Sequence, residues 1–280
     1  MRLKPLLLLA PLALSVLACA PQDEAETVTE ADSCATADLP VLLPGSLTVA
    51  TDSPAYEPWF VDNKPANGQG FESAVAYAVA DQLGFDKNDV TWVKVPFNNS
   101  YAPGEKRFDF DINQISITPA RQKVVDFSDG YYSAAQAVIT LKKDAAAAST
   151  LSALKDLKLG AQTGTTSLTA IRDDIQPTSE PLVFPNTNVA KQALLNGQVD
   201  AIVADLPTAF YITAVEIPEG TITGQFPTGG APEEFGLLMQ KGSELLPCIN
   251  EAVQALKDDG TLAELEQKWL SDVVDVPVLQ

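Results

Sequence analysis

The sequence contains no histidine. This absence excludes histidine-based catalytic triads, histidine metal sites and histidine general bases. Basic residues are also scarce: 18 lysines and arginines stand against 37 acids, which leaves a net charge of −19. Such a surface repels nucleic acid and anionic lipid headgroups. We therefore expect no nucleic-acid partner, no metal site and no cofactor.

The N-terminal segment is typical of an export signal. A basic start is followed by an apolar run over residues 5–16, which is too short to span a bilayer. The next residues, Val16–Cys19, are similar to a lipoprotein signal box, in which Cys19 is lipidated and becomes the mature N-terminus. Cleavage after Ala20, with Ala18 and Ala20 as the small-residue pair, is the alternative.

Two cysteines besides Cys19 lie beyond the predicted lipoprotein signal segment, residues 1–19. Residues 20–44 are interpreted as a tether, because the segment is rich in Ala, Glu, Asp and Thr and has little apolar periodicity. An even cysteine count in an exported protein predicts one disulfide, between Cys34 and Cys248. Two separate thiols are the alternative.

From residue 45 onward, apolar strand patterns alternate with helical ones. This order predicts an α/β protein with parallel sheets, and 280 residues suffice for one large or two medium domains. The expected strands are Ser46–Thr51, Val90–Val95, Asp111–Ile117, Ala137–Leu141, Leu159–Ala161 and Asp200–Ala204, and the expected helices are Phe71–Leu83, Ala190–Leu195 and one starting at Thr261.

A carboxylate receptor is predicted where the Asp111–Ile117 strand gives way to a helix. Thr118 has the position of an N-cap, and proline follows at the first helical position. Arg121 in the first turn opposes the helix dipole by about 0.3–1 kcal/mol, and a bound anion would offset this cost. Ser116, Thr118 and an arginine fork together suit a carboxylate. A surface arginine beside a routine cap is the alternative.

Six segments in order resemble the polar-amino-acid solute-binding proteins of ABC importers. They are TDSPAYEPW (51–59), GFESAVAYAVADQLG (70–84), SITPARQKVVDFSDGYY (116–132), GAQTGTTS (160–167), LLNGQVDAIVAD (194–205) and LKDDGTLAELEQKWL (256–270). The resemblance covers Ser46 to about Leu270. It implies the type II periplasmic-binding-protein fold, an α/β fold with two lobes, each a mostly parallel sheet flanked by helices, and a ligand cleft between them.

The resemblance also implies lobe boundaries. Lobe one comprises residues 45–130 and 235–280, and lobe two comprises residues 135–230. The hinge crossings are expected near residues 131–134 and 231–234.

The family's ligand contacts can be carried over position by position. The matching residues are Asp52, Tyr56, Phe97, Gln114, Ser116, Thr118, Arg121, Gln162, Thr165, Thr166 and Asp205. The resemblance implies that Arg121, hydroxyl groups and backbone N–H groups take the ligand's α-carboxylate, and that Asp205 takes its α-ammonium. A zwitterion that leaves water needs both charges paired.

The other residues that match the family's ligand contacts would form the walls of the ligand cleft. Tyr56 and Phe97 would sandwich the ligand, and Asp52, Gln114 and Gln162 would line its side-chain subsite. Trp59, in contrast, is expected in the core. Both aspartates, Asp52 and Asp205, have the alternative of being turn residues. Residues 98–107, with a Pro-Gly pair, replace a smooth amphipathic helix of the family.

The implied function is capture of a free amino acid for an ABC permease and ATPase complex. We expect a monomer outside the cytoplasm, either lipid-anchored to the cell membrane or periplasmic. One alternative is an enzyme on this fold that performs a dehydration, for which Glu57 or Asp52 would be the acid. The other is a sensor domain, which is disfavoured because no membrane-spanning pattern follows before Gln280.

Overall fold

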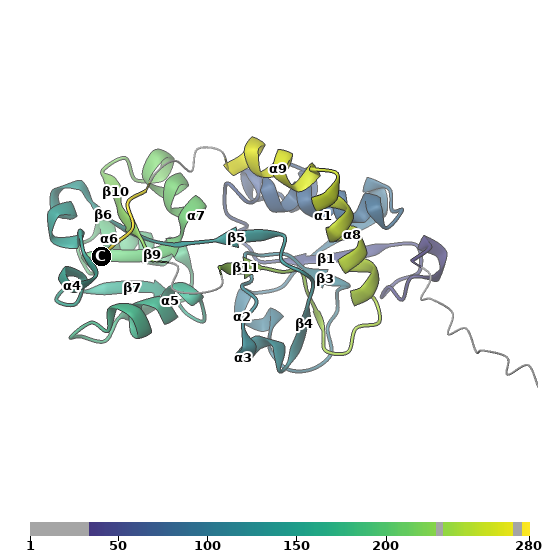
Figure 1. Cartoon of the computed structure of the whole chain (residues 1–280), viewed down its shortest axis with the longest axis horizontal. Helices are drawn as coiled ribbons and strands as arrows, with labels where there is room; N and C mark the ends of the chain where they lie inside the picture. The colour runs from purple at the N-terminus through teal and green to yellow at the C-terminus, as the bar shows by residue number, and fades with distance from the viewer. Residues whose placement is uncertain (1–33, 228–231, 271–275) are drawn as a thin grey trace, which may run out of the picture. The chain divides into compact units, whose positions relative to one another are not determined.

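The computed structural model describes residues 34–227, 232–270 and 276–280, and within them two five-stranded sheets and a two-stranded ribbon (Figure 1). The first sheet has the order β2 (Val90–Lys94), β1 (Leu47–Thr51), β3 (Phe110–Asp111), β12 (Leu238–Gln240), β4 (Val125–Phe127). The second has the order β10 (Gly220–Gln225), β6 (Gln136–Leu141), β9 (Ala201–Asp205), β7 (Leu159–Gln162), β8 (Leu182–Phe184). The ribbon pairs β11 (Glu233–Phe235) with β5 (Tyr132–Ala134).

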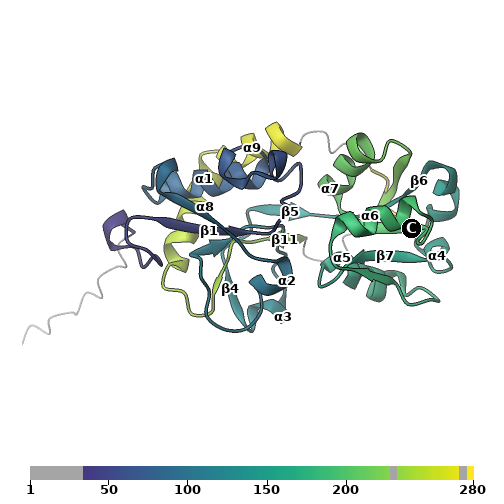
Figure 2. The same ribbon diagram turned by 180° about the vertical axis from the view of Figure 1, so that it is seen from behind.

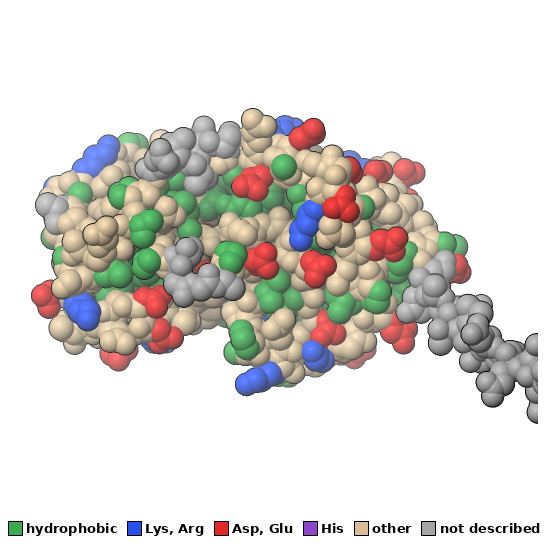
Figure 3. All heavy atoms as spheres, viewed as in Figure 1, with side chains coloured by type: hydrophobic (Ala, Val, Ile, Leu, Met, Phe, Trp, Pro, Cys, Tyr) green, Lys and Arg blue, Asp and Glu red, His purple; other side chains and the backbone are tan. Residues whose placement is uncertain are grey.

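Short and long helices connect these strands. They are α1 (Phe71–Gln82), α2 (Phe97–Ser100), α3 (Pro119–Gln122), α4 (Leu151–Leu154), α5 (Thr166–Ala170), α6 (Thr187–Leu195), α7 (Leu206–Tyr211), α8 (Leu246–Asp258) and α9 (Thr261–Leu270). Among the described residues, no helix is both long and apolar enough to cross a membrane. Acidic side chains are spread over the face shown in Figure 3, in keeping with the net charge.

Both sheets are mixed. In the first, β1 is parallel to β2 and β3, while β12 runs antiparallel to β3 and β4. In the second, β7 is parallel to β8 and β9, while β6 runs antiparallel to β9 and β10. The parallel strands come from the predicted strand–helix alternation. The antiparallel strand β12 follows the return of the chain through β11, so it enters the first sheet from the opposite direction.

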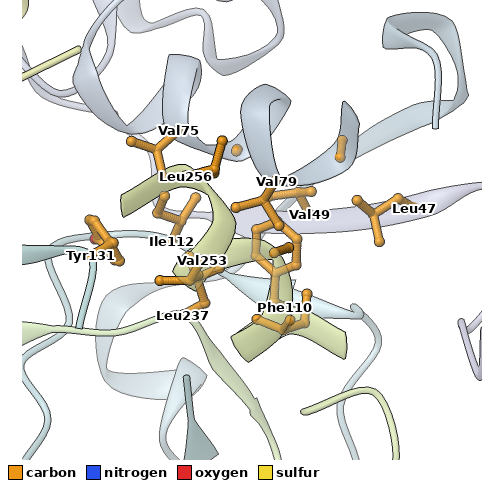
Figure 4. Close-up of a cluster of buried hydrophobic side chains, with 14 of the residues drawn as sticks. Leu47, Val49, Val75, Val79, Phe110, Ile112, Tyr131, Leu237, Val253 and Leu256 are labelled. Carbon is orange, nitrogen blue, oxygen red and sulfur yellow. The ribbon is translucent and has the colours of Figure 1, made fainter. Parts of the chain in front are cut away.

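Three amphipathic helices cover one face of the first sheet, and the views in Figures 1 and 2 both show α1, α8 and α9 packed together there. The core between them contains Val49 of β1, Val79 of α1 and Val253 of α8, all fully buried (Figure 4). Each such side chain contributes roughly 1.5–3 kcal/mol by leaving water. The opposite face holds a separate cluster that includes Phe97 and Ile115.

The second sheet is buried on both faces because its central strands are mainly apolar and are buried along nearly their whole length. Ile139 of β6 lies opposite Ile202 of β9, and both belong to the cluster beneath α6 and α7. Val138 and Val203 are the next pair in register and belong to the cluster on the other face, beneath α5. Successive residues of a strand point to opposite faces, so one apolar run supplies two cores.

The C-terminal tail belongs to the second sheet, which corrects its predicted place in lobe one. The backbone N–H of Leu279 donates to Gln225 O of β10 at 2.9 Å, and Gln225 N donates to Pro277 O at 2.9 Å. The Leu279 side chain is buried in the cluster beneath α5. An apolar residue near the chain end thus fills the core of the second lobe.

The segment preceding the Arg121 helix is shorter as a strand than predicted. Strand β3 ends at Asp111, and Gln114 has a positive φ of 46°, which breaks the extended run. The Gln114 N–H is bound by Glu72 Oε1 at 2.6 Å instead of by a neighbouring strand. Pairing resumes only at Ser116, which forms an isolated bridge with Phe235.

The predicted disulfide is confirmed, since Cys34 is bonded to Cys248 of α8 and the two Cα atoms lie 5.4 Å apart. The predicted tether, residues 20–44, is wrong in its last part. Leu39 is buried in the first core, and Leu42 N donates to Asp109 Oδ1 at 2.6 Å, so this part packs against the first lobe. The export signal and Cys19 lie outside the described residues.

Candidate functional site

A cavity lies where residues of both sheets meet. Most of the predicted ligand-binding residues line it, namely Asp52, Tyr56, Phe97, Gln114, Gln162, Thr165, Thr166 and Asp205. Sequence reasoning missed further lining residues, namely Asn113, Ser167, Thr187, Val203, Ala204 and Thr208. Several of these residues are next to a predicted residue in the sequence, and this adjacency is the only feature of the sequence that could have identified them.

The cavity lies at the carboxyl ends of parallel strands. Asp52 follows β1, Gln162 is the last residue of β7, and Asp205 is the last residue of β9. Open α/β sheets place ligands at these strand ends, because the loops that follow converge there. The local sequence explains the geometry, since an apolar strand ends in a polar residue in each lobe.

Arg121, Ser116 and Thr118 are not among the residues that line the cavity, and Arg121 and Ser116 are buried. Arg121 is only 8 % exposed, and its guanidinium donates to Ser116 O at 2.7 Å and to Gly164 O at 3.0 Å. It also stacks on the rings of Phe97 and Tyr101, which lie 5.5 and 4.7 Å from Cζ. Burial lowers the pKa of Arg121 from its ordinary value, and the negative charge of Glu233 acts in the opposite direction.

The predicted cap of the Arg121 helix is present, since Thr118 Oγ1 accepts from Arg121 N at 3.2 Å. The helix itself, Pro119–Gln122, is one turn long, so its dipole contributes little to an anion site. The positive charge at this wall is therefore the guanidinium. Ser116 Oγ lies 3.2 Å from Oγ1 of Thr166, a residue that lines the cavity, so a hydrogen bond connects Ser116 to the lining.

A polar network surrounds Asp205, and two of its members were missed in the sequence. Gln136 Nε2 donates to Asp205 Oδ1 at 2.7 Å and to Glu233 Oε2 at 3.0 Å. Glu233 Oε1 accepts from Ser116 Oγ at 2.5 Å. Burial, together with the charges of Glu233 and Glu72, raises the pKa of Asp205 to about 8.

A buried glutamate, Glu72, holds one of the lining residues, Gln114, in place. Glu72 of α1 accepts hydrogen bonds from the backbone and side-chain nitrogens of Gln114 and from the hydroxyl of Tyr131. Burial raises the pKa of Glu72 to about 7. The bonds hold Gln114 in its left-handed conformation at the cavity. A glutamate within an apolar helix face was the signal that the sequence offered.

The two acids of the lining are not matched by a lining base. Asp52 accepts from Ser53 N at 2.6 Å and from Phe97 N at 3.1 Å, which ties the loop after β1 to α2. Lys191 lies 5.8 Å from the ring centre of Tyr56, but its amine is paired with Glu216 at 2.6 Å. The cavity lining therefore has two acids and no base, and the lysine beside Tyr56 is paired with Glu216.

Hydrogen bonds join the two sides of the cavity. Trp59 Nε1 donates to Thr208 Oγ1 at 2.8 Å, and Tyr101 OH donates to Gly164 O at 3.3 Å. Trp59 is fully buried, as predicted for a core residue. Among the described residues, no cluster of acids and cysteines has the arrangement of a metal site.

Comparisons with known proteins agree with this geometry. The family model of bacterial extracellular solute-binding proteins, family 3, matches residues 47–272. The glutamine-binding protein GlnH of Bacillus subtilis strain 168 is 31 % identical over 213 residues, covering 74 % of this chain and 76 % of GlnH. The L-cystine-binding protein TcyJ of Escherichia coli strain K12 is 27 % identical over 227 residues, covering 80 % of this chain and 82 % of TcyJ.

Solved structures give the same result. The crystal structure of an ancestral amino-acid-binding protein, described as a precursor of cyclohexadienyl dehydratase, is 32 % identical with a TM-score of 0.68. The match covers 81 % of this chain and 95 % of that one. The two-lobe α/β fold expected from the sequence is thus confirmed. The chain belongs to family 3 of the bacterial extracellular solute-binding proteins.

Proposed function

We propose that the protein is the solute-binding component of an ABC importer and that it captures a polar amino acid for the membrane permease and its ATPase. One observation carries the proposal: a buried guanidinium, Arg121, lies behind one wall of the cavity, and a carboxylate, Asp205, lies at the other. The relatives named above bind glutamine and cystine.

The α-carboxylate of the ligand binds at the Arg121 wall. A guanidinium has five N–H donors, and the two bonds to Ser116 O and Gly164 O leave others for a ligand. The hydroxyl of Thr118 and backbone N–H groups at residues 165–166 complete the receptor, and Ser116, whose hydroxyl donates to Glu233, orients the guanidinium through its backbone oxygen. Each bond to a charged group contributes about 1.5–3 kcal/mol.

The α-ammonium pairs with Asp205, and the ligand's side chain extends toward Asp52. Tyr56 and Phe97 enclose it, and Gln114 and Gln162 supply amide groups from the two lobes. An acidic side chain would meet Asp52 without a lining base to pair with. We therefore propose a ligand whose side chain donates hydrogen bonds, through an amide or a cationic group, and rejection of glutamate and aspartate.

A thermal-shift screen of the twenty amino acids, followed by calorimetry, tests this function. A ligand at 100 times its Kd adds about 2.7 kcal/mol to stability. Arg121→Ala should weaken binding by about 2–5 kcal/mol, or at least 30-fold, and Asp205→Asn should also weaken it. Arg121→Lys should bind the ligand better than Arg121→Ala but more weakly than wild type, because an ammonium lacks the planar fork of donors.

The matched control is Arg107→Ala, which removes an exposed arginine of the same lobe and should leave binding unchanged. Near wild-type affinity in Arg121→Ala would mean that the site is wrongly placed. If no amino acid shifts the melting temperature, the proposed ligand class is wrong.

Binding without catalysis is part of the proposal. Of the acids named for a dehydration, Glu57 lies outside the lining and interacts with Tyr211. The lining acid with a raised pKa is instead Asp205, which we assign to the ligand's α-ammonium. A dehydratase would convert prephenate-type substrates, so turnover of such a substrate by the pure protein would refute this part.

We also propose that the signal is cleaved before Cys19, that Cys19 is lipidated as the new N-terminus, and that the protein is held on the outer face of a membrane. The family is described as extracellular, which supports export. Cys19→Ala should release the protein to the soluble fraction. Unchanged membrane retention would contradict the lipid anchor and favour another mode of attachment.

For the lobes, we propose a monomer with hinge crossings near residues 131–134 and 231–234. β5 and β11, which pair with each other between the two sheets, support this assignment. Small-angle scattering should show a smaller radius of gyration on adding ligand. An unchanged radius at saturating ligand would count against hinge closure.

A further inference from the structure

Two carboxylates converge on a single amide group beside the cavity. Gln136 Nε2 lies 2.7 Å from Asp205 Oδ1 and 3.0 Å from Glu233 Oε2. The other end of this amide, Oε1, accepts from Ser167 Oγ at 2.6 Å, which fixes the nitrogen toward the acids. Gln136 is only 6 % exposed, so the arrangement is part of the interior.

The two acids are close enough to repel each other when both are ionised. Both carboxylate oxygens lie within 3.0 Å of one nitrogen, so they are no more than about 6 Å apart, where like charges disfavour ionisation. The amide has two protons, and Thr166 Oγ1, at 3.3 Å from the same nitrogen, is a third acceptor. This donor therefore cannot satisfy two full negative charges.

The other charged and titratable groups around the pair include one cation. The neighbours of the pair are Glu72 of α1, Arg121 of α3, Tyr131 and Tyr132 at β5, and Asp174, which shares a recess with Glu233. Arg121 is the only cation among them, and its two described hydrogen bonds go to backbone carbonyls. Burial first, and then the charges of Glu233 and Glu72, raise the pKa of Asp205 to about 8, although Arg121 acts in the opposite direction.

We infer that Glu233 is a positioning residue of the ammonium site: through Gln136 it makes Asp205 hold a proton in the empty site, and the entering ammonium displaces this proton. This inference rests on the proposed function, in which Asp205 binds the α-ammonium. The step balances, because the Asp205 O–H bond breaks, its proton passes to the buffer, and the resulting carboxylate pairs with the ammonium. Glu233 keeps its hydrogen bond from Ser116 Oγ.

Ligand binding is then coupled to proton release below pH 8. With a pKa of about 8 in the empty site, Asp205 is protonated at pH 6.5, and it is ionised when the ammonium is bound. Linkage then requires release of about one proton per ligand at this pH and an affinity that rises up to about tenfold per pH unit toward pH 8.

Calorimetry of the full exported chain with the amino acid that binds best tests this coupling. Titrations at pH 6.5 in buffers of different ionisation enthalpy give the number of protons released, and we expect about one for the wild type. Glu233→Gln, which removes the neighbouring charge, should release less than about half a proton and flatten the pH dependence of Kd. Glu234→Gln is the matched control, because its side chain is the exposed neighbour on the same strand.

Wild-type binding without proton release would overturn the inference, and so would an unchanged proton count in Glu233→Gln. Carbon-13 NMR of the carboxyl groups in the ligand-free wild type needs neither a ligand nor a variant. We expect Asp205 to titrate near pH 8, and titration of both Asp205 and Glu233 below about pH 6 would overturn the inference even if amino-acid binding holds. Absence of binding to any amino acid would overturn the proposed function instead, and with it the displacement step.

Discussion

Replacement of Asp111 by asparagine is expected to stabilise the protein as the pH rises. Asp111 lies on β3 with no exposed surface, and among the described residues neither carboxylate oxygen has a hydrogen-bond partner. Burial, and then the charges of Glu72 and Asp52, raise the pKa of this carboxyl well above its ordinary value, while Lys106 acts in the opposite direction. The folded protein therefore keeps this group protonated over a pH range in which the unfolded chain has lost the proton.

The sign of the effect follows from proton counting. An unfolded aspartate titrates near a pKa of about 3.9, so above that pH the folded state binds more protons than the unfolded state. The free energy of unfolding then falls as the pH rises, by about 1.4 kcal/mol per pH unit, until the folded-state pKa is reached. Asparagine cannot ionise, so Asp111→Asn removes this slope while it keeps the size and polarity of the side chain.

Urea unfolding of the ligand-free protein at pH 4, 5, 6 and 7 measures the difference. Wild type and Asp111→Asn should be similar at pH 4, and above that the variant should gain up to about 1.4 kcal/mol per pH unit relative to wild type, as far as the folded-state pKa of Asp111. Asp81→Asn, at an exposed position of α1, should follow the wild-type curve. Parallel curves for wild type and Asp111→Asn would refute the reasoning, because they would show that Asp111 ionises alike in both states.

Three further changes test contacts seen in the structure. Gly164→Ala should lower ligand affinity in calorimetry, because φ is +75° there and an added Cβ would collide with Asn98 Oδ1; unchanged affinity would contradict this close approach. Replacing Cys34 and Cys248 by serine should lower the free energy of unfolding by about 2–4 kcal/mol, and an unchanged denaturation midpoint would contradict this. Trp59→Phe removes the indole hydrogen bond across the cavity and should weaken binding by about 0.5–1.5 kcal/mol in calorimetry; unchanged affinity would contradict a role for this bond.

Local features of the sequence predicted most of the elements that carry the cavity. The apolar run before Asp205 is strand β9, and the glycine after Leu83 has a φ of +80° at the end of α1. Thr118 caps the Arg121 helix as its type and position indicate. These features are legible because strand alternation, helix caps and glycine turns depend on residues within a few positions of each other.

The tertiary structure alone decided which polar groups meet. Gln136 contacts Asp205 across 69 residues and Glu233 across 97, and no local pattern encodes either contact. The burial of Leu279 in the core of the second sheet was equally unpredictable, because its partner strand β10 lies more than fifty residues earlier in the chain. Apolar periodicity specifies that a side chain is buried, but only the packed chain determines which buried charges face one another, and this in turn sets the pKa values at the site.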